Sequence, residues 1–272
     1  MKTIVVTGAT GHQGGAVVDA LLASGTPWRV RALTRKADSA AAKALAVRGV
    51  EPVEADLDRP ETLTPALEGA YGVFGVQQRG KKETARGVSL IDAAVQAGVE
   101  HFVYSSVGGV ERVRGIPHFD SKWEVEKHLR QSGLPATVLR PSSYMEGFTM
   151  PGAATMGMSM MSATLGDSKT LQMIAVRDIG IFAALAFASP ATYIGETLEL
   201  AGDELTVPQM ARFTGKKYWR RMPQWLLRAM GPESRMFFWF GESGYQADIA
   251  DLRRRHPGLL TFEQWFTQQA KG

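Results

Sequence analysis

The first 141 residues alternate between short runs rich in Val and Ile and longer segments whose apolar residues have helical spacing. Such alternation is typical of βαβ units, in which crossover helices join parallel strands. Helices are expected over residues 12–24, 39–48, from about 61, 83–97 and 118–131. The six strands expected are Ile4–Val6, Trp28–Leu33, Val50–Val53, Tyr71–Val76, His101–Ser105 and Ala136–Leu139. The pattern predicts an α/β fold with a doubly wound parallel sheet and right-handed crossovers.

Beyond Pro141 the regular alternation ends. Residues 145–173 hold seven of the 12 methionines, interleaved with Gly, Ser, Thr and Ala and without a visible period. Two interpretations remain open: a flexible cover over an apolar substrate cleft, or a partly disordered loop. Later elements are expected as a helix over 178–188, a strand near 198–200, and helices starting near Thr206, Pro223, Pro232 and Thr261. We therefore expect two domains, residues 1–145 and a smaller, mostly helical C-terminal lobe of residues 146–272.

A glycine-rich turn, Thr7–Gly15, joins the first strand to the first helix. Gly8 permits a tight turn, Gly11 lets backbone amides reach a pyrophosphate, and Gly14 lets helix and strand approach closely. The N-terminus of the helix then faces the phosphates. The turn predicts a Rossmann dinucleotide-binding fold, and the cofactor-binding residues expected here are Gly8, Thr10, Gly11, His12, Gln13 and Gly14.

The residues after the second strand bear on which dinucleotide binds. An acidic residue at this position would bind the ribose 2′-hydroxyl of NAD(H), yet no carboxylate precedes Asp38. Arg35 offers a planar guanidinium to a 2′-phosphate, and Lys36 adds a second positive charge. The sequence therefore favours NADP(H) over NAD(H). The alternative is that both residues belong to a solvated basic loop.

Three later strand ends supply further candidate residues. Asp56 and Leu57 follow the third strand, where Asp56 either binds the adenine amine or caps a helix. Gln77 and Gln78 follow the fourth strand, in the loop expected beside the cofactor ribose and nicotinamide. Ser105 ends the fifth strand at the carboxyl edge of the sheet, where ligands bind in open α/β folds.

The segment after the fifth strand lacks a tyrosine that short-chain dehydrogenases normally use. Their Tyr-x-x-x-Lys motif is replaced here by His118-Phe-Asp-Ser-Lys122, so general acid catalysis would fall to Lys122, His118 or an ordered water. Two alternatives remain open: Lys122 only positions the cofactor, and His118 only faces solvent at a helix start.

The run from His118 to Glu126 resembles the NmrA-like family of atypical short-chain dehydrogenases. The same family's pattern continues in order over most of residues 1–190, at Thr7–Gly15, Thr34–Arg35, Val103–Ser105, Leu139–Pro141, Tyr144–Glu146 and Val176–Gly180. The resemblance implies that Lys122 is a candidate proton donor, as in isoflavone-reductase-like enzymes. It also implies that Tyr144 and Glu146 lie near the cofactor, although Gly147 stands where relatives usually carry asparagine.

The resemblance implies two classes of function. Some members of the family reduce quinones or conjugated carbonyls with NADPH, and others bind the dinucleotide as redox sensors that regulate a protein partner. The first hypothesis is therefore an oxidoreductase with a small apolar substrate, and the alternative is a sensor. A nucleotide-sugar epimerase is disfavoured, because that chemistry depends on the missing tyrosine.

Composition excludes several other classes. The chain has no cysteine, so it can hold no disulfide, thiolate nucleophile or Cys-ligated zinc, and no metal site is expected. Residues 212–272 carry 11 basic against 5 acidic residues, but their many aromatic residues favour packing over nucleic-acid binding. The apolar runs are too short for a secretory signal or a membrane span, so we expect a cytoplasmic protein with no membrane partner.

Overall fold

A computed structural model describes residues 1–149 and 152–269, and within it the chain forms two compact units. Unit 1 contains Met1–Ser106, Ser121–Leu139 and Ile179–Leu198, and unit 2 contains the remaining segments. The chain therefore passes between the units several times. Whether residues 1–145 and 146–272 behave as separate domains stays a prediction.

A seven-stranded sheet lies at the centre of the α/β part, in the order β3-β2-β1-β4-β5-β6-β9. Each adjacent pair from β3 to β6 is parallel. The strands are β1 (Thr3–Val6), β2 (Arg29–Thr34), β3 (Glu51–Glu54), β4 (Gly72–Gly75), β5 (His101–Ser105), β6 (Ala136–Pro141) and β9 (Thr197–Leu200). This order confirms the doubly wound Rossmann sheet, in which successive strands are added toward one edge from β1 to β3 and toward the other edge from β4 onward.

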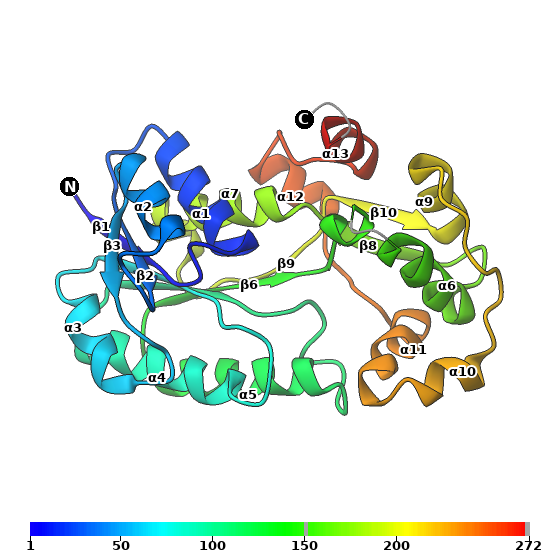
Figure 1. Ribbon diagram of the computed structural model, residues 1–272, viewed down its shortest axis with the longest axis horizontal. Coiled ribbons are helices and arrows are strands. Elements are labelled where there is room, and N and C mark those ends of the chain that lie inside the picture. The colour runs from blue at the N-terminus through cyan, green and yellow to red at the C-terminus, as the bar shows by residue number, and fades with distance from the viewer. Residues whose placement is uncertain (150–151, 270–272) are drawn as a thin grey trace. The chain divides into compact units, whose positions relative to one another are not determined.

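Helices cover both faces of this sheet (Figure 1). One face carries α1 (His12–Ala23), α2 (Ala40–Val47) and α7 (Val176–Ala188), and the other carries α3 (Leu63–Leu67), α4 (Glu83–Gln96) and α5 (Pro117–Gln131). A Cβ on Gly180 of α7 would lie 2.3 Å from the carbonyl oxygen of Ala16 in α1. The two helices can pack this closely only because residue 180 has no side chain.

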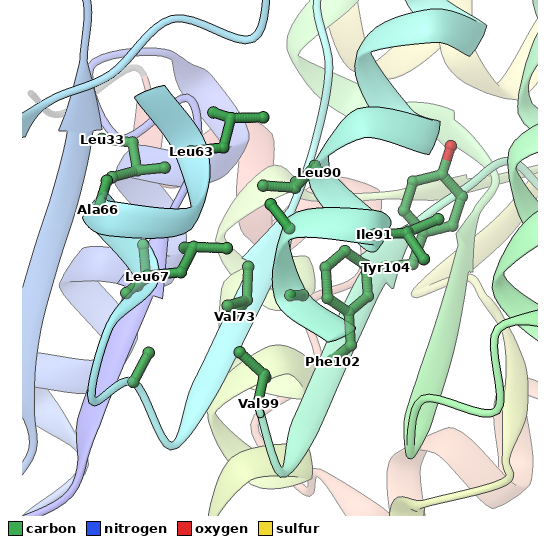
Figure 2. Packing of buried hydrophobic residues seen from close by; sticks show 14 of the residues in the cluster. Leu33, Leu63, Ala66, Leu67, Val73, Leu90, Ile91, Val99, Phe102 and Tyr104 are labelled. Carbon is green, nitrogen blue, oxygen red and sulfur yellow. The ribbon is translucent and has the colours of Figure 1, made fainter. Parts of the chain in front are cut away.

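The core beneath α3 and α4 is made of aliphatic and aromatic side chains (Figure 2). Leu90 and Ile91 of α4 are fully buried, as are Phe102 and Tyr104 of β5. Burial of each such side chain contributes about 1.5–3 kcal/mol. Gly87 gives α4 room against α5, because a Cβ there would lie 2.6 Å from Val125 Cγ2. This packing fixes the N-terminal end of α4 next to α5.

The seventh strand extends the sheet beyond the six expected strands. Gly195 N donates to Ala136 O and Val138 N to Glu196 O, so β9 runs parallel to β6. The sequence predicts a strand near residues 198–200, but it assigns that strand to the C-terminal lobe. The short helix α8 (Pro190–Tyr193) leads into it. Residues 179–198 thus complete unit 1.

Unit 2 is mostly helical around a three-stranded sheet, in the order β10-β8-β7. Its strands are β7 (Ser143–Tyr144), β8 (Thr170–Ile174) and β10 (Asp203–Thr206). Its helices include α6 (Ala153–Leu165), α9 (Val207–Thr214), α10 (Gln224–Ala229), α11 (Arg235–Glu242), α12 (Ile249–Arg255) and α13 (Phe262–Gln269). The smaller, mostly helical lobe is therefore confirmed.

The interpretation of residues 145–173 as a partly disordered loop is wrong for the residues that the structure describes. Residues 153–165 form α6, and β8 follows it. Ala154, Met158, Met161 and Leu165 are buried at spacings of three and four, which is a helical period hidden among small polar residues. Met150 and Pro151 lie outside the described residues. That this segment covers a substrate stays a prediction.

Candidate functional site

The glycine-rich turn closes tightly between β1 and α1. Gly8 has a φ of +62°, a left-handed conformation that favours glycine, and Gly11 N donates to Gly8 O at 2.8 Å. A Cβ on Gly14 would lie 2.3 Å from Gly8 O, so helix and turn are in backbone contact there. Gly11 precedes α1 without a side-chain cap, and the first turn of α1 has no acidic residue. The helix end is therefore open to an anion.

A cavity of about 760 Å³ lies beside this turn, within unit 1. Its apolar wall includes Leu33, Ala55 and Leu63, and Ser39 and Arg86 add polar groups. Eight of the sequence-predicted residues line it: Gly8, Thr10, Gly11, Arg35, Lys36, Asp56, Leu57 and Gln78. The turn after β1 and the strand ends after β2, β3 and β4 therefore meet at one cavity, as the strand order requires.

The positive charges in the cavity differ in how they are paired. Arg35 and Lys36 are exposed, and neither forms an ion pair with another described residue. Arg86 instead forms two hydrogen bonds to the carboxylate of Asp58, at 2.9 and 2.7 Å. These bonds, with the charges of Arg86 and Lys82, lower the pKa of Asp58 to about 2. Arg35 and Lys36 are thus the cations left for an added anion.

Asp56 has a local role in addition to lining the cavity. Its Oδ1 accepts from the backbone N–H of Asp58 at 3.0 Å, while its own N–H donates to Thr62 Oγ1 at 3.0 Å. These contacts shape the turn before the 3₁₀-helix Pro60–Thr62. Asp56 therefore stabilises the turn and does not cap the 3₁₀-helix, whose N-cap residue is Arg59. Its binding to an adenine amine stays a prediction.

Three buried polar groups near the carboxyl ends of β4 and β5 have no hydrogen-bond partner among the described residues. They are both polar atoms of the Gln77 side chain, the Tyr104 hydroxyl and the Ser106 hydroxyl. Gln77 is 6% exposed, and the other two are buried more completely. Unpaired buried polar groups cost roughly 1–3 kcal/mol each, so each of these groups is a candidate contact for a ligand or a water.

Ser105 links the turn to Lys122 through two of its atoms. Its hydroxyl donates to Gln13 Oε1 at 2.6 Å, and its carbonyl oxygen accepts from Lys122 Nζ at 2.9 Å. Gln13 belongs to the first turn of α1, and Lys122 to α5. Gln13, Ser105 and Lys122 were predicted separately from sequence, and the structure brings them together.

Lys122 is held in a buried polar cluster. Burial lowers the pKa of its ammonium group, and the negative charges of Glu83 and Glu126 oppose that effect. Nζ lies 3.2 Å from Glu83 Oε1, and the lysine side chain is 14% exposed. Glu83 was not anticipated from sequence, because an acidic residue in the first turn of a helix is ordinary.

Four other expected residues are not among those that line this cavity. His12 is exposed at the start of α1. His118, Tyr144 and Glu146 belong to unit 2. His118 does not simply face solvent, because its Nδ1 lies 2.5 Å from Glu233 Oε2. Glu146 Oε1 accepts from the Val176 backbone at 2.9 Å, and burial raises the pKa of this carboxyl.

Within residues 1–149 and 152–269, no three His, Asp or Glu side chains are grouped as ligands for a metal ion. No helix in those same ranges has the length and apolar character needed to cross a membrane.

Comparison with known proteins gives consistent matches. The sequence model of the NmrA-like family matches residues 1–226. An NmrA-like family domain-containing oxidoreductase, FrzB, from a Cladobotryum species is 29% identical over 82% of this chain and 77% of its own length. An NAD(P)H azoreductase from Xenophilus azovorans is 33% identical over 69% of this chain and 64% of its own length.

Solved structures show the same fold. Citrobacter triphenylmethane reductase, complexed with NADP(H), has a TM-score of 0.79 at 22% identity, covering 98% of this chain and 99% of that one. An NADPH-dependent quinone oxidoreductase from Escherichia coli, complexed with NADPH, has a TM-score of 0.79 at 24% identity with the same coverage. NmrA, a negative transcriptional regulator, in complex with NADP, has a TM-score of 0.75 at 20% identity, covering 100% and 98%.

Proposed function

The chain belongs to the NmrA-like family, and we propose that it is an NADPH-dependent oxidoreductase of quinones or conjugated carbonyls. The observation that carries the proposal is the cavity beside the glycine-rich turn, with Arg35 and Lys36 at its rim and free of ion pairs within the described residues. A cavity of this composition fits a phosphorylated dinucleotide. A family match alone would leave the cofactor undecided.

The residues of the cavity fit each part of NADP(H). The turn at Gly8–Gly11 and the uncapped N-terminus of α1 suit the pyrophosphate. The apolar side chains of Leu33 and Leu63 suit an adenine ring. Arg35 and Lys36 suit the 2′-phosphate, because an arginine can bind its oxygens with two parallel hydrogen bonds. The unpaired amide of Gln77 suits a polar group further along the cofactor.

The proposed reaction needs little acid catalysis from the protein. NADPH, when bound, supplies a hydride. Lys122 holds protons on Nζ, and its contact with Ser105 fixes that nitrogen near the end of β5. A conjugated acceptor spreads the negative charge that hydride addition creates, so a lysine ammonium or a water can replace the missing tyrosine.

The relatives support this acceptor class. The printed names of the similar proteins include an azoreductase, a triphenylmethane reductase and a quinone oxidoreductase. Azo compounds, triphenylmethane dyes and quinones are all conjugated molecules that accept a hydride without a strong acid. A conjugated, largely apolar acceptor is therefore the first class to test for this chain.

The test is steady-state oxidation of NADPH against a panel of quinones and conjugated carbonyls, with NADH in parallel. We expect turnover above the uncatalysed rate with at least one acceptor and a preference for NADPH. Lys122→Met should lower kcat by roughly 10²–10⁴-fold if Nζ donates the proton. No turnover with any acceptor would refute the enzyme proposal.

A second candidate is a sensor that binds NADP(H) and regulates a protein partner. His118 occupies the position of the usual catalytic tyrosine, and its ring is engaged by Glu233. NmrA, of similar fold, is a transcriptional regulator complexed with NADP. A sensor requires that partner and NADPH change each other's affinity. Capture of partners with and without NADPH tests it, and an unchanged yield argues against it.

A further inference from the structure

Glu83 begins α4 and is almost fully buried, with 1% of its surface exposed. Each of its carboxylate oxygens has a partner on α5. Oε1 lies 3.2 Å from Lys122 Nζ, and Oε2 accepts from Ser121 Oγ at 2.8 Å. The Glu83 N–H donates to Gly80 O at 3.0 Å, which fixes the first turn of the helix. Both carboxylate oxygens and the backbone of Glu83 are therefore fixed by hydrogen bonds or an ion pair.

The surroundings of Lys122 contain few groups that can balance its charge. Glu83 faces it from α4, Ser105 O and the Tyr104 ring face it from β5, and Glu126 lies one turn further along α5. Glu126 is itself engaged by Arg130 at 2.5 Å. Glu83 is thus the carboxylate in direct contact with the ammonium group. A buried ammonium without such a partner would more readily lose its proton and become a neutral amine, because burial disfavours the charged form.

We propose that Glu83 is a positioning residue that keeps Lys122 charged and holds its Nζ against the carbonyl oxygen of Ser105. Two acceptors, Glu83 on α4 and the Ser105 carbonyl on β5, then fix the nitrogen in place. The use of the fixed ammonium in proton donation rests on the proposed oxidoreductase function. The pairing of Glu83 with Lys122 does not.

The first turn of α4 then serves two parts of unit 1. Glu83 contacts Lys122, and Arg86, three residues later, lines the cavity and binds Asp58. Because residues three apart project from adjacent parts of a helix surface, one turn orients both groups. Through Ser105 and Gln13 the same ammonium is connected to the first turn of α1. Lys122 therefore has a fixed place relative to the glycine-rich turn.

The direct test measures the pKa of Lys122 without any need for turnover. Lysine side chains are labelled with ¹³C, the Cε resonance of Lys122 is assigned with Lys122→Met, and its shift is followed over pH. In Glu83→Gln we expect the pKa of Lys122 to fall by about 1–3 units relative to wild type. In Glu83→Asp, which keeps the negative charge, the pKa of Lys122 should fall less. An unchanged pKa in Glu83→Gln would overturn the proposal.

A rescue experiment covers the case in which Glu83→Gln folds poorly. That variant leaves a buried ammonium without its partner, and Lys122→Met then removes the stranded charge. The double variant should unfold at a higher urea concentration than Glu83→Gln alone. If Lys122→Met gives no rescue, the two residues are not coupled and the proposal fails.

The catalytic readout is separate. If the enzyme turns over a quinone, the basic limb of its kcat/KM profile should move to lower pH in Glu83→Gln, by the same number of units as the measured pKa of Lys122. The absence of turnover would count against the oxidoreductase function and leave the result of the pKa titration standing.

Discussion

The hydroxyl of Ser105 donates a hydrogen bond of 2.6 Å to Oε1 of Gln13, which joins the carboxyl end of β5 to the first turn of α1. Both residues belong to unit 1. Their separation in the sequence is 92 residues, so only the folded sheet can bring them together. The bond therefore reports on the assembly of the proposed cofactor site.

We expect Ser105→Ala to lower the free energy of unfolding by about 1 kcal/mol, because it removes this hydrogen bond and leaves Gln13 with one donor fewer. Ser106→Ala is a matched control. The Ser106 side chain is equally buried but has no partner among the described residues, so its removal should cost little or even stabilise. Urea denaturation measures both variants, and equal losses would contradict the assignment.

Gly14→Ala should destabilise the protein by at least about 2 kcal/mol, because the new Cβ would lie 2.3 Å from Gly8 O and backbone cannot give way cheaply. Binding of NADPH should weaken with it. Gly15→Ala is the neighbouring control, since its Cβ would lie at an ordinary 3.5 Å from Ala9 O. We expect that change to stabilise the helix by up to about 1 kcal/mol. Thermal unfolding that ranks the two variants the other way would refute this geometry.

Arg35→Ala should weaken the binding of NADPH by about tenfold to a hundredfold, since the proposed contact with the 2′-phosphate is charge-assisted and would contribute about 1.5–3 kcal/mol. NADH has no such phosphate, so its affinity should change little. Titration calorimetry with both cofactors measures the difference. Arg48→Ala, a basic residue paired with Asp19 away from the cavity lining, serves as the control. Equal losses for both cofactors would mean that Arg35 supports the fold instead.

The free energy of unfolding should decrease as the pH is lowered, and His101 is the cause. Its Nε2 lies 2.8 Å from Thr137 Oγ1, and that hydroxyl donates to Tyr193 O, so Nε2 is the donor to Thr137. Burial lowers the pKa of His101 from 6.5 to about 4. Below pH 6.5 the unfolded chain binds a proton that the folded chain excludes until near pH 4, so acid favours unfolding in that window.

We expect the protonation of His101 to lower the free energy of unfolding by on the order of 2 kcal/mol when the pH is lowered from 7 to 5. His101→Gln keeps a donor for Thr137 but does not titrate, and its unfolding free energy should depend less on pH. Urea denaturation at the two pH values measures the difference between the proteins. Identical pH dependence in both would show that His101 does not carry the effect.

Much of unit 1 was predictable because its signals are local. A few neighbouring residues are enough to recognise each pattern: the β-branched runs, the glycines at 8, 11 and 14, and the basic pair at 35 and 36. The strand order of the sheet then brings the ends of β1 to β4 to one cavity. Position along a βαβ pattern is therefore enough to anticipate eight of the residues that line that cavity, although not Ser39 or Arg86.

The rest depended on contacts that have no local pattern. Glu83 resembles any acidic residue at a helix start until α5 is placed against it. The methionines of α6 follow a helical period, but Gly, Ser and Thr between them conceal it. In the sequence the seventh strand, β9, is a short strand pattern with no neighbouring strand pattern. Only its backbone hydrogen bonds to β6 assign it to the main sheet.

The glycine-rich turn and the basic pair after β2 differ in how much change each can accept. Gly14 touches the backbone of Gly8, so substitution there disturbs the fold itself. The side chains of Arg35 and Lys36 are exposed and form no ion pair with another described residue, so they can be exchanged while the packing stays as it is. If the proposed 2′-phosphate site is correct, substitutions at Arg35 and Lys36 should therefore change the choice between NADPH and NADH without lowering the stability of the fold, whereas no substitution at Gly14 should do so.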